Sequence, residues 1–254
     1  MYHSITFGDK NTWDDWKIVP SSRPVFSPPK QKTTYLEIPG ADGSIDISTA
    51  LTGYPVYENR TGSFEFLVMN DYPEYRWEMV YSNIMVYLHG QAMKAILEDD
   101  PNYYYEGRFS VDDWSSEKDY SKIKIGYNVG PYKWSLQTST DPNWLWDPFN
   151  FVEDYVSASL WSNIPLTDSS IWVTREFTSL TAGQAPICPI FTVDAPSTNG
   201  IDVYIINGTM GTTKETHIPN GTSYRHDIMI FGGDVTVGFK GIGTVSVEFR
   251  KGRL

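Results

Sequence analysis

The chain has 254 residues, of which 40% are hydrophobic and 20% are charged, so it can bury a core and is not an intrinsically disordered chain. Its formal net charge of −11 disfavours binding to nucleic acid, because an acidic surface repels a phosphate backbone. The sequence has no run of ~18 apolar residues, so we expect no membrane insertion.

Aromatic residues make up 15% of the chain, including 9 Trp and 17 Tyr. Their broad apolar rings with one polar group suit β-sheets, protein interfaces and sugar-binding surfaces, and composition does not separate the three. Cys188 is the single cysteine, so an internal disulfide is excluded, and its apolar neighbours predict a buried small residue. The first residues do not have the pattern of a signal peptide, and we expect synthesis in a reducing cytoplasm.

The chain opens with a short predicted strand, Ser4–Phe7, followed by a turn. The stretch Pro20–Pro29 holds four prolines, which exclude a helix or a central strand because proline fixes φ and lacks an amide proton. It predicts an extended arm that lies against its own domain or against a neighbouring subunit.

Residues 34–69 are predicted to form strands and turns. Ser44–Ser48 alternates with a period of two, which places Ile45 and Ile47 on one face, and Gly62–Met69 is a second alternating strand. A helix is predicted at about 73–89, ending at Gly90. Its apolar stripe consists of Trp77, Val80, Tyr81, Ile84, Met85 and Leu88.

Three further strands are predicted after the helix, at Ala92–Leu97, Tyr103–Val111 and Tyr120–Val129. In the last of them the apolar residues point one way and the lysines the other. The first half is therefore predicted to be mainly antiparallel β with one helix packed against it.

The composition changes at about 131–150, where Pro, Ser, Thr and Asp accumulate. From about 151 onward, short strands alternate with turns and no helical pattern occurs, which is typical of a β-sandwich. We predict an N-terminal domain at 1–137, a linker at 138–150 and a C-terminal sandwich at 151–254. The strands expected in the sandwich are 155–161, 171–178, 187–193, 201–206, 212–217, 223–231, 234–239 and 244–250.

No pattern indicates a cofactor or a metal. The four histidines lie far apart in the sequence, and no phosphate-binding or dinucleotide-binding glycine motif occurs. The enzymatic alternative is a glycosidase, which needs two carboxylates beside aromatic platforms. The candidate residues are Glu98, Asp99, Asp100, Glu106, Asp112 and Asp113, among Tyr103, Tyr104, Tyr105 and Trp114. A turn with solvated charges explains the same residues, so we expect no catalytic residue.

A second alternative is a carbohydrate-binding module in residues 151–254. Trp161 and Trp172 are the candidate glycan platform, because aromatic faces stack on the apolar faces of sugars. Either residue could also belong to the core of the sandwich, and we favour the core.

Several segments, taken in order, resemble the distal tail (Dit) proteins of siphophages, which infect mostly Gram-positive bacteria. The resemblance is dense in the first half and looser in the second, where it depends on length, β pattern and the closing Val245–Leu254. Lys251 and Arg253 depart from the glycine-rich ending common in the family. The segments of the first half are Ile5–Pro24, Pro28–Pro29, Ile38–Ser48, Asn59–Phe66, Leu88–Gln91, Leu97–Phe109 and Asp119–Trp134.

The resemblance implies a structural virion protein at the phage tail tip. Its first domain would be split-barrel-like with one helix, and its second a galectin-like or carbohydrate-module-like sandwich. Family members form a hexameric ring through the first domain, which joins the tail tube to the tail-tip hub or tail-associated lysin protein. The second domain projects outward to receptor-binding or baseplate proteins. A carbohydrate-binding module for a host cell-surface glycan is the alternative function.

The residues expected at the ring interface are aromatic or basic residues and one proline. Trp13, Trp16, Arg23 and Pro24 belong to the predicted arm, and Tyr54, Tyr57 and Arg60 precede the Gly62 strand. Replacing Trp13 and Trp16 by Ala is expected to prevent ring formation and to leave a folded monomer. Six chains at −11 each carry −66, and we hypothesise that this charge repels DNA from the channel.

Overall fold

The computed structural model describes residues 2–69, 77–116, 120–141, 161–177, 185–207, 212–230 and 235–254. The chain divides into two compact units, one of residues 1–133 with Leu254 and one of residues 134–253. The predicted linker at 138–150 lies mostly within 142–160, outside the described residues. The described part of the chain is mainly β with one helix, which confirms the predicted class.

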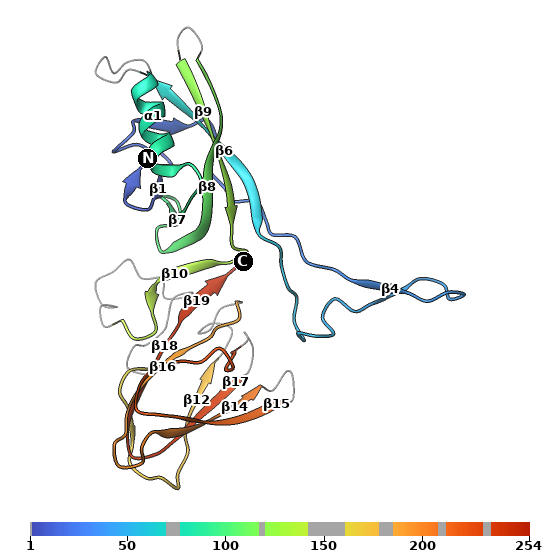
Figure 1. The fold of residues 1–254 in the computed structure, drawn as a ribbon, viewed down its shortest axis with the longest axis vertical. Coiled ribbons are helices and arrows are strands. Elements are labelled where there is room, and N and C mark those ends of the chain that lie inside the picture. Colours follow the sequence, from blue (N-terminus) through green and yellow to red (C-terminus); the bar gives the residue numbers. More distant parts are fainter. Residues whose placement is uncertain are drawn as a thin grey trace. The chain divides into compact units, whose positions relative to one another are not determined.

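The first unit is built on one antiparallel sheet, with strand order β2-β1-β7-β8-β9-β6-β3 (Figure 1). Its strands are β1 (Ile5–Phe7), β2 (Lys10–Asn11), β3 (Ile18–Pro20), β6 (Arg60–Met69), β7 (Gln91–Leu97), β8 (Tyr103–Ser116) and β9 (Tyr120–Val129).

This sheet curls until its two edges meet. The edge strands β2 and β3 lie at opposite ends of the strand order, yet residues 12–17 join them directly. Ile18 N donates to Thr12 O over 2.9 Å, and Thr12 N donates to Ile5 O of β1 over 2.9 Å. The result is a nearly closed barrel.

The helix α1 (Trp77–Leu88) packs on this sheet through Val80, Ile84 and Leu88, which recur every four residues and are buried. Gly90 follows the helix with φ +74°, a left-handed conformation that favours glycine, so the predicted stop is confirmed. The predicted start near residue 73 lies outside the described residues. The predicted alternation of β9 is also confirmed, because its apolar side chains are buried in the same core while Lys124 is exposed.

The proline-rich stretch Pro20–Pro29 lies against its own unit. Pro24 and Phe26 are buried, and the Phe26 ring packs among Phe64, Tyr105 and Tyr127. The segment that follows these prolines is exposed to solvent. Every residue from 30 to 47 is exposed, and this segment carries a separate hairpin of β4 (Tyr35–Glu37) and β5 (Ser44–Asp46).

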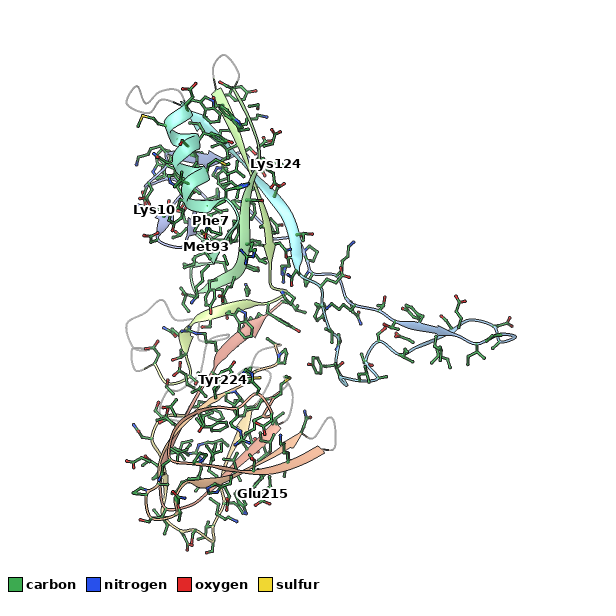
Figure 2. All side chains as sticks on the ribbon, viewed as in Figure 1. Phe7, Lys10, Met93, Lys124, Glu215 and Tyr224 are labelled. Atoms are coloured by element: carbon green, nitrogen blue, oxygen red, sulfur yellow. The ribbon has the colours of Figure 1, made fainter. Side chains whose placement is uncertain are left out.

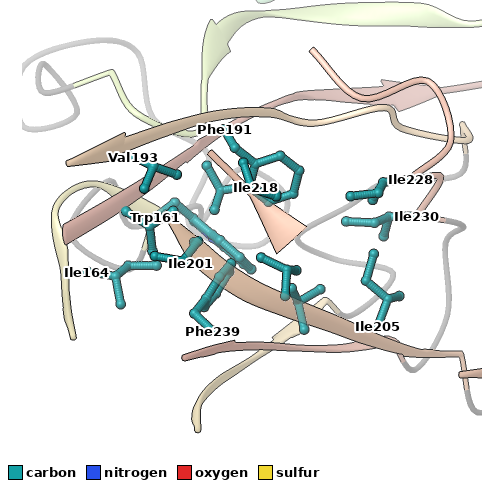
Figure 3. Packing of buried hydrophobic residues seen from close by; sticks show 14 of the residues in the cluster. Trp161, Ile164, Phe191, Val193, Ile201, Ile205, Ile218, Ile228, Ile230 and Phe239 are labelled. Carbon is teal, nitrogen blue, oxygen red and sulfur yellow. The ribbon is translucent and has the colours of Figure 1, made fainter. Parts of the chain in front are cut away.

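The second unit is a β-sandwich with one sheet of order β11-β18-β13-β16 and another of order β12-β17-β14-β15. Side chains from both sheets form a single core, in which Trp161, Phe191 and Phe239 are among the largest buried side chains (Figure 3). Its likeness to galectins stays a prediction. The strands are β11 (Ile164–Leu166), β12 (Val173–Phe177), β13 (Ile190–Asp194), β14 (Ile201–Asn207), β15 (Thr212–Ile218), β16 (Gly221–Tyr224), β17 (Val235–Lys240) and β18 (Gly243–Glu248).

Two more strands pair with each other, β10 (Lys133–Thr138) and β19 (Arg250–Arg253). Among the described residues, no helix is long and apolar enough to cross a membrane.

Candidate oligomer interface

The arm, residues 30–58, presents apolar side chains to solvent. In its hairpin, Leu36 pairs with Ile45 across the two strands, and each side chain is 50% exposed. A two-stranded hairpin is at most marginally stable in water, so its exposed apolar side chains make it a candidate contact surface. Its exposed large hydrophobic residues are Tyr35, Leu36, Ile38, Ile45, Ile47 and Leu51.

Local chemistry sets the shape of the hairpin. Gly40 and Gly43 have φ angles of +83° and +77°, which place both in the left-handed region that suits a turn without a Cβ. At the open end of the hairpin, opposite the turn, Ser48 Oγ accepts from Thr34 N over 2.8 Å, and Ile47 N donates to Thr34 O over 3.0 Å. The hairpin therefore has a defined register without a core of its own.

The two legs of the arm are paired at its base, and the hairpin lies at the far end of the arm (Figure 1). Lys32 N donates to Val56 O and Glu58 N donates to Lys30 O, each over 2.8 Å. Gln31 and Tyr57 form an antiparallel bridge between the same legs. The arm is thus paired at its base and again in its hairpin.

Arg60 fixes the base of the arm. Its Nη1 donates to Ser27 O and its Nε to Pro131 O, each over 2.9 Å, and its guanidinium lies 5.5 Å from the centre of the Tyr105 ring. Arg60 is 5% exposed, and burial lowers the pKa of its guanidinium. No partner for Nη2 is found among the described residues. Arg60, at the start of β6, therefore joins the segment before the arm to the segment after β9.

The structure separates the seven predicted interface residues into two groups. Trp16, Pro24 and Arg60 are buried within the first unit, so in this structure they support the fold and present no surface to a partner. Trp16 is 6% exposed and packs near Phe7 and Tyr87. The expectation for Trp13 and Trp16 is corrected accordingly: removing the Trp16 indole would open a cavity in the core, so the double variant would not isolate the interface.

The other four predicted residues are accessible. Trp13 is half-buried and stacks on Tyr2 at 3.9 Å, while Arg23 is exposed and donates from Nε to Asp99 over 2.8 Å. Tyr54 and Tyr57 are half-buried at the end of the arm's second leg. Burial, together with Tyr57 and Tyr54, raises the pKa of the nearby Tyr132 to about 12.

The acidic turn after β7 is occupied by internal contacts. Glu98 accepts from Ser4 N over 2.7 Å, Asp99 accepts from His3 and Arg23, and Asp100 accepts from Lys133 Nζ over 2.6 Å.

The backbone N–H of Ser4 lowers the pKa of Glu98. Desolvation acts to raise the pKa of Asp99, but the hydrogen bonds and the charges of Arg23 and His3 together lower it. A glycosidase acid needs a raised pKa, and these two carboxylates show the opposite. Tyr103, Tyr104 and Tyr105 are buried.

The two tryptophans considered as a glycan platform lie in different environments. Trp161 is 1% exposed and packs on Phe177 and Phe249 in the sandwich core, so it presents no open face to a sugar. Trp172 is half-buried, with the Lys240 ammonium 4.4 Å from its ring centre and Tyr204 beside it. Among the described residues, no group of three or more side chains that could hold a metal ion is found.

No protein-family model matches the chain, and no curated protein matches it in sequence. Its structure is similar to a crystal structure of the SPP1 Dit (gp 19.1) protein, described as a paradigm of the hub adsorption apparatus in phages that infect Gram-positive bacteria. The TM-score is 0.60 at 12% sequence identity, and the match covers 99% of both chains.

The chain has the fold of a siphophage distal tail protein. Because the match spans both units, the resemblance found in the sequence is confirmed for the whole fold, including the second half, where the sequence resemblance was loose. The exposed hairpin was missed as a candidate because its isoleucines alternate as in a strand with one covered face. The clue available in the sequence was the Pro39–Gly43 turn between two short apolar segments.

Proposed function

We propose that this chain is a structural protein of a phage tail tip, where it assembles with copies of itself into a ring that connects the tail tube to the tail-tip hub. The single observation that carries the assembly step is the arm, an ordered hairpin with exposed apolar side chains and no cover within its own chain among the described residues. The distal-tail fold supports the tail-tip role.

The occupant of the hairpin is a second copy of this chain. We infer that the arm docks on a different patch of the next subunit in a head-to-tail contact, because a ring of more than two subunits requires such a contact. Head-to-tail contacts of identical subunits close into a ring when the rotation between neighbours divides a full turn. The sequence resemblance gives six as the number of subunits.

The accessible predicted residues fit the rim of such an interface. Trp13, Tyr54 and Tyr57 combine apolar rings with polar groups, and Arg23 has its side chain 67% exposed while it pairs with Asp99. Tail tube protein, hub or tail-associated lysin protein, and receptor-binding or baseplate proteins are the further partners that this role implies.

The experiment that tests the proposal is the mass of the purified protein by light scattering over a range of concentrations. One chain has 28.9 kDa, so a ring of six has about 173 kDa. A mass near this value supports the ring. A mass of one chain at every concentration contradicts self-assembly of the free protein.

A further inference from the structure

A cleft of about 320 Å³ lies on the surface of the second unit. This volume is at the lower end of the range for small-molecule sites. The cleft lies wholly within residues of this unit, and the inference drawn from it does not depend on ring assembly. The lining residues that carry the argument are Trp134, Cys188, Ile190, Tyr224, Glu248 and Arg250.

The floor and one wall of the cleft are formed by a row of residues that crosses three strands. Ile190 of β13 pairs with Tyr224 of β16 on one side and with Glu248 of β18 on the other. Their neighbours Phe191 and Val247 are fully buried in the sandwich core. Because side chains alternate along a strand, Tyr224, Ile190 and Glu248 point together to the outer face of the sheet.

Two aromatic rings border this row. Tyr224 is 55% exposed, and the His226 ring meets it edge-on at 4.4 Å (Tyr224 is labelled in Figure 2). Trp134 of β10 lies close to the backbone of β19, since a Cβ at Gly252 would come within 2.8 Å of its ring. The absence of a side chain at Gly252 thus lets the indole form part of the cleft.

The segment after Tyr224 is held in place by ion pairs. Arg225 donates to both carboxylate oxygens of Asp227, each over 2.8 Å, and Lys214 Nζ lies 3.0 Å from the same carboxylate. Arg225 also donates to the backbone of His217 on β15. These contacts limit the motion of the turn, so the Tyr224 ring is presented without a large ordering cost.

The charged groups of the cleft are balanced. Arg250 donates from Nη1 to the carbonyls of Ser135 and Leu136, and within the described residues its Nε and Nη2 have no hydrogen-bond partner. Glu248 is exposed, and no ion pair involving it occurs in the described part of the chain. One guanidinium and one carboxylate together offer hydrogen-bond donors and acceptors with no net charge.

We propose that this cleft binds a neutral saccharide. The faces of Tyr224 and Trp134 suit the apolar faces of a sugar ring, and Arg250 and Glu248 suit its hydroxyl groups as donor and acceptor. An anionic ligand would meet the Glu248 carboxylate and the overall charge of −11. A further outward row, Thr222, Thr192 and Ser246, continues from the cleft with hydroxyl groups and extends the surface for a second sugar residue.

Cys188 supplies a direct test, because it lines the cleft and is the chain's single cysteine. Burial raises the pKa of its thiol, so alkylation is measured at about pH 8.5, where a useful thiolate fraction forms. The full chain is alkylated with iodoacetamide in the presence of each of a panel of neutral methyl glycosides (gluco, galacto, manno, rhamno and N-acetylglucosamine) at up to ~20 mM, which detects millimolar binding. We expect at least one glycoside to slow the alkylation in a saturable way.

The variant Tyr224→Ala is expected to weaken that protection about tenfold, and Glu248→Gln to weaken it measurably, while both variants keep the wild-type circular dichroism spectrum. The control is Ile206→Ala, which removes an exposed side chain on β14 of the same unit outside the cleft and leaves protection unchanged. Protection by no glycoside of the panel, or protection that persists in Tyr224→Ala, overturns the proposal. Protection only by a proline-rich peptide also overturns it and identifies the cleft as a protein-docking surface.

Discussion

The hairpin of the arm makes a quantitative prediction about assembly. Leu36 and Ile45 form a cross-strand pair on an exposed element, and each side chain is 50% exposed in the single chain. Replacing both with Ser removes apolar surface that, in the proposed ring, is covered by the next subunit. The folded chain itself loses little, because exposed substitutions change the free energy of unfolding by about 0.5 kcal/mol or less.

The size of the effect follows from the exposed area. Complete burial of a Leu or Ile side chain contributes ~1.5–3 kcal/mol, so covering the exposed half of each contributes about 1 kcal/mol. The pair then contributes about 2 kcal/mol to each contact between subunits. Its loss raises the dissociation constant of that contact roughly 30-fold in the variant. A closed ring contains one such contact per subunit, so the losses add up around the ring. The protein concentration needed for ring assembly therefore rises steeply in the variant.

Sedimentation velocity over a concentration series measures this change, with thermal unfolding of the same samples to check the fold. The matched control is Ile171→Ser with Ile206→Ser in the second unit, whose side chains are 59% and 41% exposed and so present a similar total exposure. We expect wild-type assembly in the control and weakened assembly in the hairpin variant. An unchanged dissociation constant in the hairpin variant, or equal weakening in both, would refute the role of the arm.

Two further predictions concern the second unit. Trp161→Ala should lower the free energy of unfolding by about 3–5 kcal/mol in urea titrations, because Trp161 is 1% exposed and its loss leaves a cavity; a change below 1 kcal/mol would contradict its place in the core. The hydrogen bond between His217 Nδ1 and Asp202, 2.8 Å long, raises the pKa of His217 above its ordinary value of 6.5. The stability it adds is therefore present below about pH 6.5 and is lost as the pH rises through the folded-state pKa, and Asp202→Asn should lower that pKa in an NMR titration.

Local patterns in the sequence were sufficient for the elements of the first unit that have one covered face. β9 alternates over its whole length, and its apolar residues are buried as predicted. The helix stripe and its stop at Gly90 were also predictable, because both depend on spacing and on the conformational freedom of one residue. The fold class followed from these periodicities together with the family resemblance.

The interface was only partly predictable, because a periodic pattern shows which residues share a face and not what covers that face. Ile45 and Ile47 alternate as the residues of β9 do, yet both are exposed, since no strand or helix of the described chain packs on their hairpin. Trp16 and Arg60 have the composition of interface residues but are buried, because the curled sheet encloses one and the base of the arm encloses the other.

The cleft of the second unit shows the same limit for a binding site. Ile190, Tyr224 and Glu248 lie far apart in the sequence and have no motif in common. Strand register alone brings them into one row, and pairing between β10 and β19 adds Trp134 to its border. The sequence by itself indicated which residues share a face in the elements it predicted, but it missed β10 and β11. Only the tertiary structure decided which faces are buried and which remain open, because burial depends on contacts between segments distant along the chain.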